Sequence, residues 1–221
     1  MTRPLPTEPL VLYGLPLSGH CHRVALFLSL LRLPFRYEEL DLAAGAHRQP
    51  DFLALNPFGQ IPVLKDGDTV LADSNAILVY LAGRYGAEGE EGEEGEIRWL
   101  PDDPLGAAQV QRWFSAAASL LAFGPARARL KHVFGADIDY PAAVALADRL
   151  LPVMEQALSA RAYLAADAPT LADIAMYSYT AHAPEGGVSL RPYPAVRAWL
   201  QRVEALPGFV GMPRSPDQSG D

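Results

Sequence analysis

Asn56-Pro57-Phe58-Gly59-Gln60-Ile61-Pro62-Val63-Leu64, followed by Asp73-Ser74-Asn75-Ala76-Ile77, is the stretch that decides the fold. Asn-Pro and Phe-Gly are typical of a turn, and the apolar run that follows contains Pro62, which has no N–H to donate to a central ladder. This predicts an interrupted or edge strand, and a cis bond before Pro62 would present the Ile61 backbone to a ligand. Asp73 and Ser74 then open an apolar helix, whose first N–H groups attract a carboxylate, while Asp73 can pair with an ammonium. Together these parts predict a site for a small amino-acid-like molecule that carries both charges.

The residues around this stretch alternate between strand and helix patterns. Leu10 to Gly14 has the pattern of a strand that ends in a turn, and Val24, Phe27, Leu28 and Leu31 recur at helical spacing. The expected order is strand 10–14, helix 20–31, strand 35–42, short helix 52–55, a hairpin of 61–65 and 69–72, and helix 74–85. Because a helix separates the first two strands, we expect them to be parallel.

The second half of the chain has a different composition. Residues 86–96 form a low-complexity Gly-Glu segment, which we expect to be a solvated loop. From residue 105 onward no strand pattern is convincing, and alanine-rich helical patterns cover 106–123, 141–159, 171–182 and 195–204. We therefore expect an α/β domain of residues 1–85, an acidic loop and linker of 86–104, and an all-helical domain of 105–221.

Composition narrows the classes of function. The net charge of −8 is local, because six glutamates lie in the Gly-Glu segment and the rest of the chain is near −2. No basic face for nucleic acid is expected, and no apolar run approaches the ~18 residues of a membrane span. The N-terminus lacks the apolar stretch of a signal peptide, so a cytoplasmic location is expected. The single cysteine, Cys21, excludes an internal disulfide framework and a cysteine-based zinc cluster.

The quoted stretch resembles the glutathione-binding signature of the cytosolic glutathione S-transferases. The order βαβ-α-ββα is similar to the thioredoxin-like N-terminal domain of that family. Thr170-Leu171-Ala172-Asp173 is a capping-box pattern and resembles the box that opens a core helix of the family's C-terminal domain, where the aspartate is buried and structural. Residues 193–200 resemble the family's last major helix, so the resemblance covers residues ~10 to ~210. It implies a detoxifying glutathione transferase that joins the glutathione thiolate to a small hydrophobic electrophile, with glutathione as cosubstrate, no metal, and a homodimer.

The resemblance places the thiol-activating group at the start of the first helix. In the zeta-type pattern, Leu-Tyr is followed by four residues and then by Ser-Ser-Cys-x-x-Arg-Val. When this chain is aligned with that pattern, Ser18 falls on the first serine, which is the catalytic one. Gly19 departs from the second serine and His20 from the cysteine, which weakens a maleylacetoacetate isomerase interpretation. A serine and glycine before a helix more often form an N-cap, but the surrounding signature favours Ser18 as hydrogen-bond donor to the thiol.

Two other residues compete for that role. Cys21, flanked by histidines near a helix N-terminus, has the pattern of a low-pKa thiolate, although a free cysteine is more often a small buried hydrophobe. Tyr13 could serve as in tyrosine-type transferases, but it lies within the strand pattern, where packing is the commoner role.

The resemblance also assigns glutathione-binding residues. His47 precedes Gln60 by the spacing that theta-type transferases use for a histidine near the glycine carboxylate, with a surface histidine as the alternative. Gln60 should lie beside the tripeptide, and Ile61, before Pro62, should pair its backbone with the cysteinyl backbone. Asp73 and Ser74 should hold the γ-glutamyl end, and an ordinary helix cap can coexist with that role.

The helical domain offers candidates for the electrophile site. Arg112, Trp113 and Ser115, with Phe123, could line a pocket in a cleft between the domains, although aromatics at helical spacing are more often core. The basic run of Arg127, Arg129, Lys131 and His132 is expected to be a solvated helix end.

Three rival functions remain open at this point. One is a glutathione-dependent disulfide-bond oxidoreductase on the same fold, using two glutathiones or Cys21. The second is a non-enzymatic transferase-like adaptor, which should bind glutathione weakly or not at all. The third is an isomerase or dehalogenase, which the second-domain pocket would decide.

Overall fold

The computed structural model describes residues 5–86 and 97–215. These residues form two compact units: 5–86 together with 207–212, and 97–206 together with 213–215. The expected Gly-Glu loop, apart from Gly86, lies outside the described residues. None of the described helices combines the length and the apolar character that crossing a bilayer requires.

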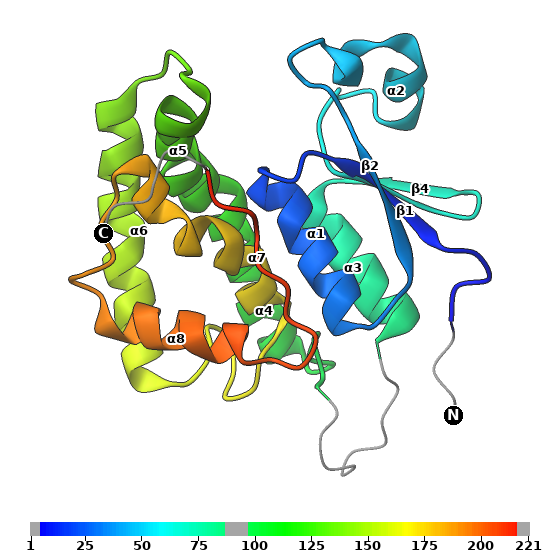
Figure 1. Ribbon diagram of the computed structural model, residues 1–221. Coiled ribbons are helices and arrows are strands. Elements are labelled where there is room, and N and C mark those ends of the chain that lie inside the picture. Colours follow the sequence, from blue (N-terminus) through cyan, green and yellow to red (C-terminus); the bar gives the residue numbers. More distant parts are fainter. Residues whose placement is uncertain (1–4, 87–96, 216–221) are drawn as a thin grey trace. The chain divides into compact units, whose positions relative to one another are not determined.

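The first unit is a four-stranded sheet with helices, as the sequence predicts (Figure 1). Its elements in chain order are β1 (Leu10–Gly14), α1 (Gly19–Leu30), β2 (Phe35–Glu39), the 3-10 turn η1 (Ala46–Arg48), α2 (Pro50–Leu55), β3 (Val63–Asp66), β4 (Thr69–Ala72) and α3 (Ser74–Tyr85). The strand order is β2-β1-β3-β4. The β1–β2 pair is parallel and the β1–β3 and β3–β4 pairs are antiparallel, so the prediction of a parallel first pair is confirmed.

Helices α1 and α3 lie side by side against the sheet (Figure 1). Between them and the strands lies the core of this unit, which includes Leu12, Val24, Phe27, Leu64 and Ile77, all fully buried. The predicted spacing of apolar residues in α1 is therefore confirmed as its core face. Two element ends differ from expectation: β2 ends at Glu39 and β3 begins at Val63, because the residues beyond have no partner in the strand register.

A segment from the far end of the chain completes this unit. Residues 207–212 contact α1, where His22 Nε2 donates to Val210 O at 2.9 Å and Ser29 Oγ donates to Gly208 O at 2.7 Å. Gly208 has φ +90°, and a Cβ there would lie 2.9 Å from Ser29 O. Glycine is therefore required where the two backbones meet.

The second unit is helical throughout its described residues. Its elements are α4 (Pro104–Ala116), the π-helical turn η2 (Ala117–Leu121), α5 (Pro125–Phe134), α6 (Tyr140–Ala160), α7 (Leu171–Ala181), the 3-10 turn η3 (Ala183–Gly186) and α8 (Pro194–Glu204). The helix expected over 106–123 is confirmed, with a π-helical turn within it. A Cβ at Gly124 would lie 2.5 Å from Leu120 O and 2.9 Å from Ala147 N, so the backbones approach closely where this helix ends.

The predicted capping box at α7 is confirmed and extends into a buried network. Asp173 accepts hydrogen bonds from Thr170 N at 2.8 Å, Leu164 N at 2.9 Å and Trp199 Nε1 at 2.8 Å. The box satisfies the first amides of α7, and the same carboxylate ties α7 to α8 and to the loop before it. Because each of these donors is buried, losing the carboxylate would leave several polar groups unsatisfied.

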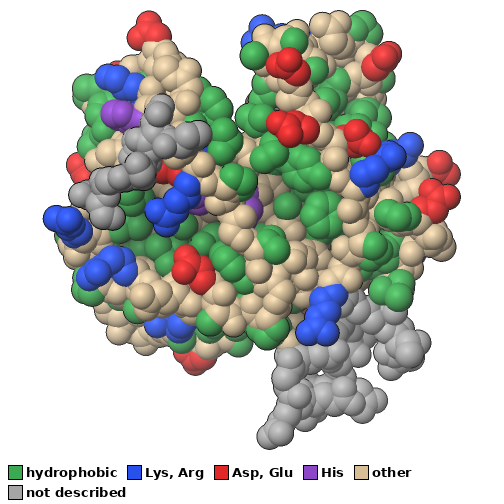
Figure 2. All heavy atoms as spheres, in the orientation of Figure 1, with side chains coloured by type: hydrophobic (Ala, Val, Ile, Leu, Met, Phe, Trp, Pro, Cys, Tyr) green, Lys and Arg blue, Asp and Glu red, His purple; other side chains and the backbone are tan. Residues whose placement is uncertain are grey.

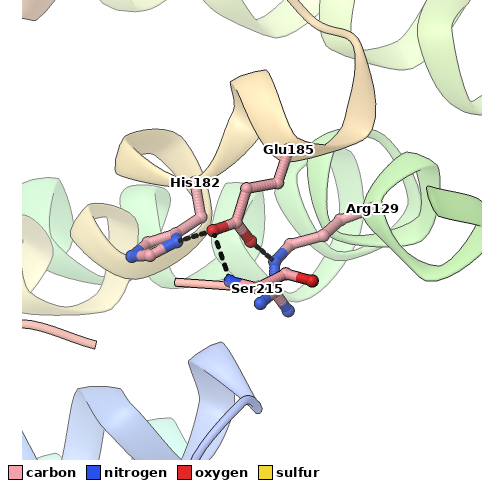
Figure 3. Close-up of polar contacts among 4 residues, drawn as sticks. All are labelled: Arg129, His182, Glu185 and Ser215. Carbon is pink, nitrogen blue, oxygen red and sulfur yellow. Dashed lines mark hydrogen bonds and ion pairs between the residues drawn. The ribbon is translucent and has the colours of Figure 1, made fainter. Parts of the chain in front are cut away.

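A second buried polar cluster corrects the expectation of a solvated basic run for Arg129, whereas Lys131 and His132 are exposed as expected. Arg129 is 2% exposed, and its Nε donates to Glu185 Oε2 in η3. The other carboxylate oxygen lies 3.0 Å from His182 Nδ1 and accepts from Ser215 N at 3.3 Å (Figure 3). The burial of Arg129 could not be predicted from local sequence because its acidic partner lies in a turn far along the chain. Removing one partner of such a buried pair costs ~3–5 kcal/mol.

His182 and Glu185 both have a pKa below the ordinary value for their residue type. Burial lowers the pKa of His182, and this outweighs the opposing influence of the hydrogen bond to Glu185. Burial alone would raise the pKa of Glu185, but the hydrogen bonds from Arg129 and His182 outweigh it and hold that pKa below its ordinary range. The charges of Arg129 and Arg214 also lower the pKa of His182. The folded unit therefore binds these two protons less readily than the unfolded chain does.

On the face shown in Figure 2, the basic side chains of the described residues are scattered among acidic and apolar ones and form no continuous patch. This distribution agrees with the near-neutral charge of the chain outside its Gly-Glu segment.

We expect acidification to weaken the helical unit through His182 and Glu185. The unfolded chain takes up protons near pH 6.5 at histidine and near pH ~4.3 at glutamate, so both contributions are present near neutral pH and are lost as pH falls through and below those values. The measurement is the free energy of unfolding by denaturant at pH ~7 and ~5. His182→Gln should reduce the pH dependence. The exposed His132 provides the matched control, His132→Gln, which should not. An equal pH dependence in all three proteins would contradict the prediction.

Candidate functional site

The strand register brings three segments of the predicted site to one end of the sheet. Val63, the first residue of β3, pairs with Tyr13 on one side and with Ala72 on the other. The chain entering β3 therefore passes beside the end of β1, which leads to Ser18, and the end of β4, which leads to Asp73. Backbone pairing thus makes neighbours of the strand ends that lead to these residues.

Ser18 is the N-cap of α1. Its backbone is extended, with φ −88° and ψ 118°, and its Oγ accepts from Cys21 N at 3.5 Å. The cap uses a lone pair of the oxygen, whereas the hydroxyl proton is a separate donor. The side chain is half-buried. The predicted cap is therefore present, and it leaves the hydroxyl able to donate to a second group.

The Asn56–Gln60 turn is held by a residue that the sequence did not single out. Asn56, 2% exposed, accepts from Phe58 N at 3.1 Å through Oδ1 and donates from Nδ2 to Gln60 O at 2.7 Å. Its side chain thus spans the turn and orients the backbone that leads to Ile61. The Asn-Pro dipeptide was a signal for a turn, but not for a buried side chain.

Ile61 lies where a ligand could pair with its backbone. The Ile61–Pro62 peptide bond is cis, as the sequence suggested. Ile61 precedes the first paired residue of β3 and so has no partner in the strand register. Gln60 is exposed and Ile61 is half-buried.

Asp73 and Ser74 begin α3 in the expected way. Asp73 Oδ1 accepts from Asn75 N and Ala76 N, each at 2.9 Å. Asp73 has φ +68°, which is uncommon for a residue other than glycine and costs on the order of 1–3 kcal/mol. Both cap bonds use one carboxylate oxygen of an exposed side chain, so the other can receive a ligand ammonium.

Arg23 and His20 join Ser74 to α1. Arg23 is 1% exposed, and its Nη1 donates to Ser74 Oγ at 2.9 Å and to Asn75 Oδ1 at 2.7 Å. His20 Nδ1 lies 3.5 Å from the same Ser74 Oγ. Burial, reinforced by the charge of Arg23, lowers the pKa of His20 to about 3, so this ring is neutral at neutral pH. The sequence showed these residues only as parts of the motif around Ser18.

His47 lies in η1, near the turn that contains Gly59. A Cβ at Gly59 would approach His47 O to 3.2 Å, so the two segments touch through their backbones. The ring is half-buried, and its Nδ1 is buried with no hydrogen-bond partner among the described residues. An unpaired buried nitrogen is costly, which is consistent with a polar ligand at this point. The role of His47 near the glycine carboxylate stays a prediction.

The surroundings of Cys21 and Tyr13 differ from those of Ser18. Cys21 is fully buried, and burial raises the pKa of its thiol above the ordinary value, outweighing the opposing influence of Ser18. A buried thiol with a raised pKa is a poor nucleophile. Tyr13 is half-buried within β1, between Glu38 and Val63 in the register.

The three electrophile-site candidates lie on α4 in the helical unit. Trp113 is 2% exposed and donates from Nε1 to Leu164 O at 2.9 Å, so it belongs to the core of that unit. Arg112 and Ser115 are exposed, and the Arg112 guanidinium lies 5.4 Å from the centre of the Trp113 ring. The proposed pocket therefore rests on the two exposed side chains.

Among the described residues, no three His, Cys, Asp or Glu side chains are grouped so that they could hold a metal ion. The polar groups at the end of the sheet are instead hydroxyls, backbone amides, one carboxylate and a buried guanidinium. Such groups suit a zwitterionic organic ligand.

Comparison with known proteins assigns the family. The family model described as "Glutathione S-transferase, N-terminal domain" matches residues 17–84, and "Glutathione S-transferase, C-terminal domain" matches residues 112–207. The chain is 38% identical to Glutathione S-transferase 3 of Zea mays, over 96% of this chain and 99% of the relative. It therefore belongs to the glutathione S-transferase family, and its expected fold class, a thioredoxin-like domain followed by an all-helical one, is confirmed.

Solved structures give the same result. A glutathione S-transferase from Pseudomonas fluorescens is 35% identical and superposes with a TM-score of 0.84, covering 94% of this chain and 100% of that one. A glutathione transferase homologue from Drosophila mojavensis, solved with bound glutathione, is 27% identical with a TM-score of 0.74 over 90% and 89% of the two chains. These relatives place the protein among the glutathione transferases and do not favour the rival functions.

We expect Cys21 to react slowly with iodoacetamide in the folded protein, because the thiol is buried and protonated. The alkylation rate should be many-fold lower than in the denatured chain. A Cys21→Ala/Ser119→Cys variant, which carries its single thiol at an exposed position on η2, provides the reactive control. Native alkylation of Cys21 as fast as that control would restore this residue as a candidate nucleophile.

Proposed function

We propose that this protein joins the glutathione thiolate to a small hydrophobic electrophile, with Ser18 as the hydrogen-bond donor to the thiolate. The observation that carries the proposal is the meeting of the Ser18, Ile61 and Asp73–Ser74 segments beside Val63. Those segments offer a hydroxyl, the unpaired backbone of Ile61 just before β3, and a helix N-terminus.

The tripeptide would bind as follows. Its cysteinyl backbone pairs with the Ile61 backbone in the manner of an added strand. Its γ-glutamyl carboxylate lies against Ser74 and the first turn of α3, and its ammonium lies against Asp73. Gln60 and His47 are placed on the side of the glycine carboxylate. This orientation directs the sulfur toward Ser18.

The energy needed to activate the thiol is within reach of these groups. A thiol of pKa ~8.5 is only about 3% ionised at neutral pH. A hydrogen bond to a charged group contributes ~1.5–3 kcal/mol and a helix N-terminus ~0.3–2 kcal/mol. Lowering the pKa by two units requires roughly 2.7 kcal/mol, so the Ser18 hydroxyl and the start of α1 suffice together.

Ionisation does not account for the whole acceleration. The thiolate fraction rises by roughly 30-fold when the pKa falls by two units. The intrinsic reactivity of the thiolate falls at the same time, with a slope of about 0.4–0.5 per unit, which removes about 8-fold of that gain. The remaining acceleration comes from positioning the electrophile, which we assign to the helical unit with Arg112 and Ser115 among the contacts. Family membership further supports a homodimer and a cytoplasmic location.

We expect Ser18→Ala to lower turnover strongly and glutathione affinity weakly, because the hydroxyl contacts the sulfur and not the peptide frame. The pKa of the bound thiol, followed by thiolate absorbance, should rise by about one to two units, the scale of one hydrogen bond to a charge. Ser18→Thr keeps both a hydroxyl and an N-cap, and serves as the matched control. If turnover and the bound-thiol pKa are unchanged in Ser18→Ala, Ser18 does not have this role.

Calorimetry with glutathione tests the binding half of the proposal, and a chlorinated aromatic acceptor tests the chemistry. We expect saturable binding, and conjugation that exceeds reduction of a small disulfide. Absence of binding at millimolar peptide would contradict the proposed function. Disulfide reduction in excess of conjugation would favour the oxidoreductase instead.

A further inference from the structure

Arg23 is a buried cation directed at the first turn of α3. Its side chain is 1% exposed, and its Nη1 donates to Ser74 Oγ at 2.9 Å and to Asn75 Oδ1 at 2.7 Å. Burying a guanidinium is costly unless its surroundings compensate for the lost water. Both hydrogen bonds reach residues that begin α3, which is where the proposed γ-glutamyl carboxylate would bind.

The hydrogen bond from Arg23 constrains the Ser74 hydroxyl. A serine hydroxyl has one proton to donate and two lone pairs to accept with. Arg23 occupies a lone pair of Ser74 Oγ, so the proton must point elsewhere. The nearest acceptor recorded for it is His20 Nδ1, at 3.5 Å, which is the outer limit of a hydrogen bond. The Ser74 proton is therefore weakly held and available to a stronger acceptor.

The neighbouring histidine adds no charge to this arrangement. Burial, with the charge of Arg23, lowers the pKa of His20 to about 3, so the ring is neutral at neutral pH. The positive charge next to Ser74 is therefore that of Arg23. A carboxylate that accepts from Ser74 Oγ would have this guanidinium one hydrogen bond behind it.

We propose that Arg23 is a positioning residue for the anionic end of the γ-glutamyl group. By donating to Ser74 Oγ it turns the Ser74 proton outward to the ligand carboxylate, and its charge attracts that carboxylate without touching it. The inference rests on the proposed function, because it concerns the same tripeptide site. It adds a buried determinant of affinity that acts through Ser74.

A comparison of two peptides tests this role. Calorimetry would give dissociation constants for glutathione and for 4-aminobutyryl-cysteinylglycine, which is glutathione without the α-carboxylate of its γ-glutamyl residue. In Arg23→Gln, the constant for glutathione should rise by about tenfold and that for the analogue by less than about twofold, since only glutathione offers the carboxylate. A purely structural role for Arg23 would weaken both peptides by the same factor, and that result would overturn the inference.

Further variants keep the test decisive. Arg23→Lys retains a cation in a chain of similar length but loses the planar fork, so the same selective loss should appear at smaller size. If circular dichroism shows Arg23→Gln to be unfolded, the comparison of the two peptides is made with Arg23→Lys instead. Arg36→Gln, which removes an exposed arginine of β2 paired with Glu38, is the matched control and should leave both constants unchanged.

The outcomes separate the two proposals. Wild-type protein that binds neither peptide would overturn the proposed function and this inference together. Wild-type protein that binds glutathione and the analogue equally, or Arg23 variants that lose both peptides equally, would overturn only the role of Arg23.

Discussion

The proposed site depends on the register in which β3 enters the sheet. Val63 pairs with Tyr13 and Ala72 at once, and this single position fixes where three loops end. Backbone hydrogen bonding is directional and a slip of one residue would turn the side chains of β3 to the opposite face. The fully buried Val63 and Leu64 make such a slip expensive. The proposed site would need few specialised side chains, because the backbone before β3 and the helix starts would supply most of its polar groups.

Buried polar side chains further fix the positions of the segments that strand pairing brings together. In the first unit, Asn56 spans the turn before Ile61 and Arg23 links α1 to the start of α3. In the helical unit, Asp173 ties together the cap of α7, a preceding loop and α8, and Glu185 joins α5, the turn after α7 and Ser215 (Figure 3). Arg23, Asp173 and Glu185 each have at least one partner distant in sequence, whereas the partners of Asn56 are local. Because an unpaired buried group is costly, these contacts specify one arrangement of elements that apolar packing alone would leave less well defined.

Whether a feature could be predicted depends on how far apart in the sequence its interacting residues lie. Local patterns gave the turn at Asn56-Pro57, the start of α3 and the capping box at Thr170, since each depends on neighbours within a few residues. The burial of Arg23 and of Arg129 could not be predicted in this way. Their acceptors, Ser74 and Glu185, lie more than fifty residues further along the chain. An arginine within a helical pattern is expected to be solvated until the position of its partner is known.

A crystal structure of the protein with glutathione is the most direct test of the central claim, which is that the Ile61 backbone before β3 and the starts of α1 and α3 hold one tripeptide. The account predicts a cysteinyl backbone paired with Ile61, a γ-glutamyl carboxylate against Ser74, and a sulfur atom within hydrogen-bond distance of Ser18 Oγ. A sulfur atom nearest to Cys21 or Tyr13, or a peptide bound away from the end of the sheet, would contradict it.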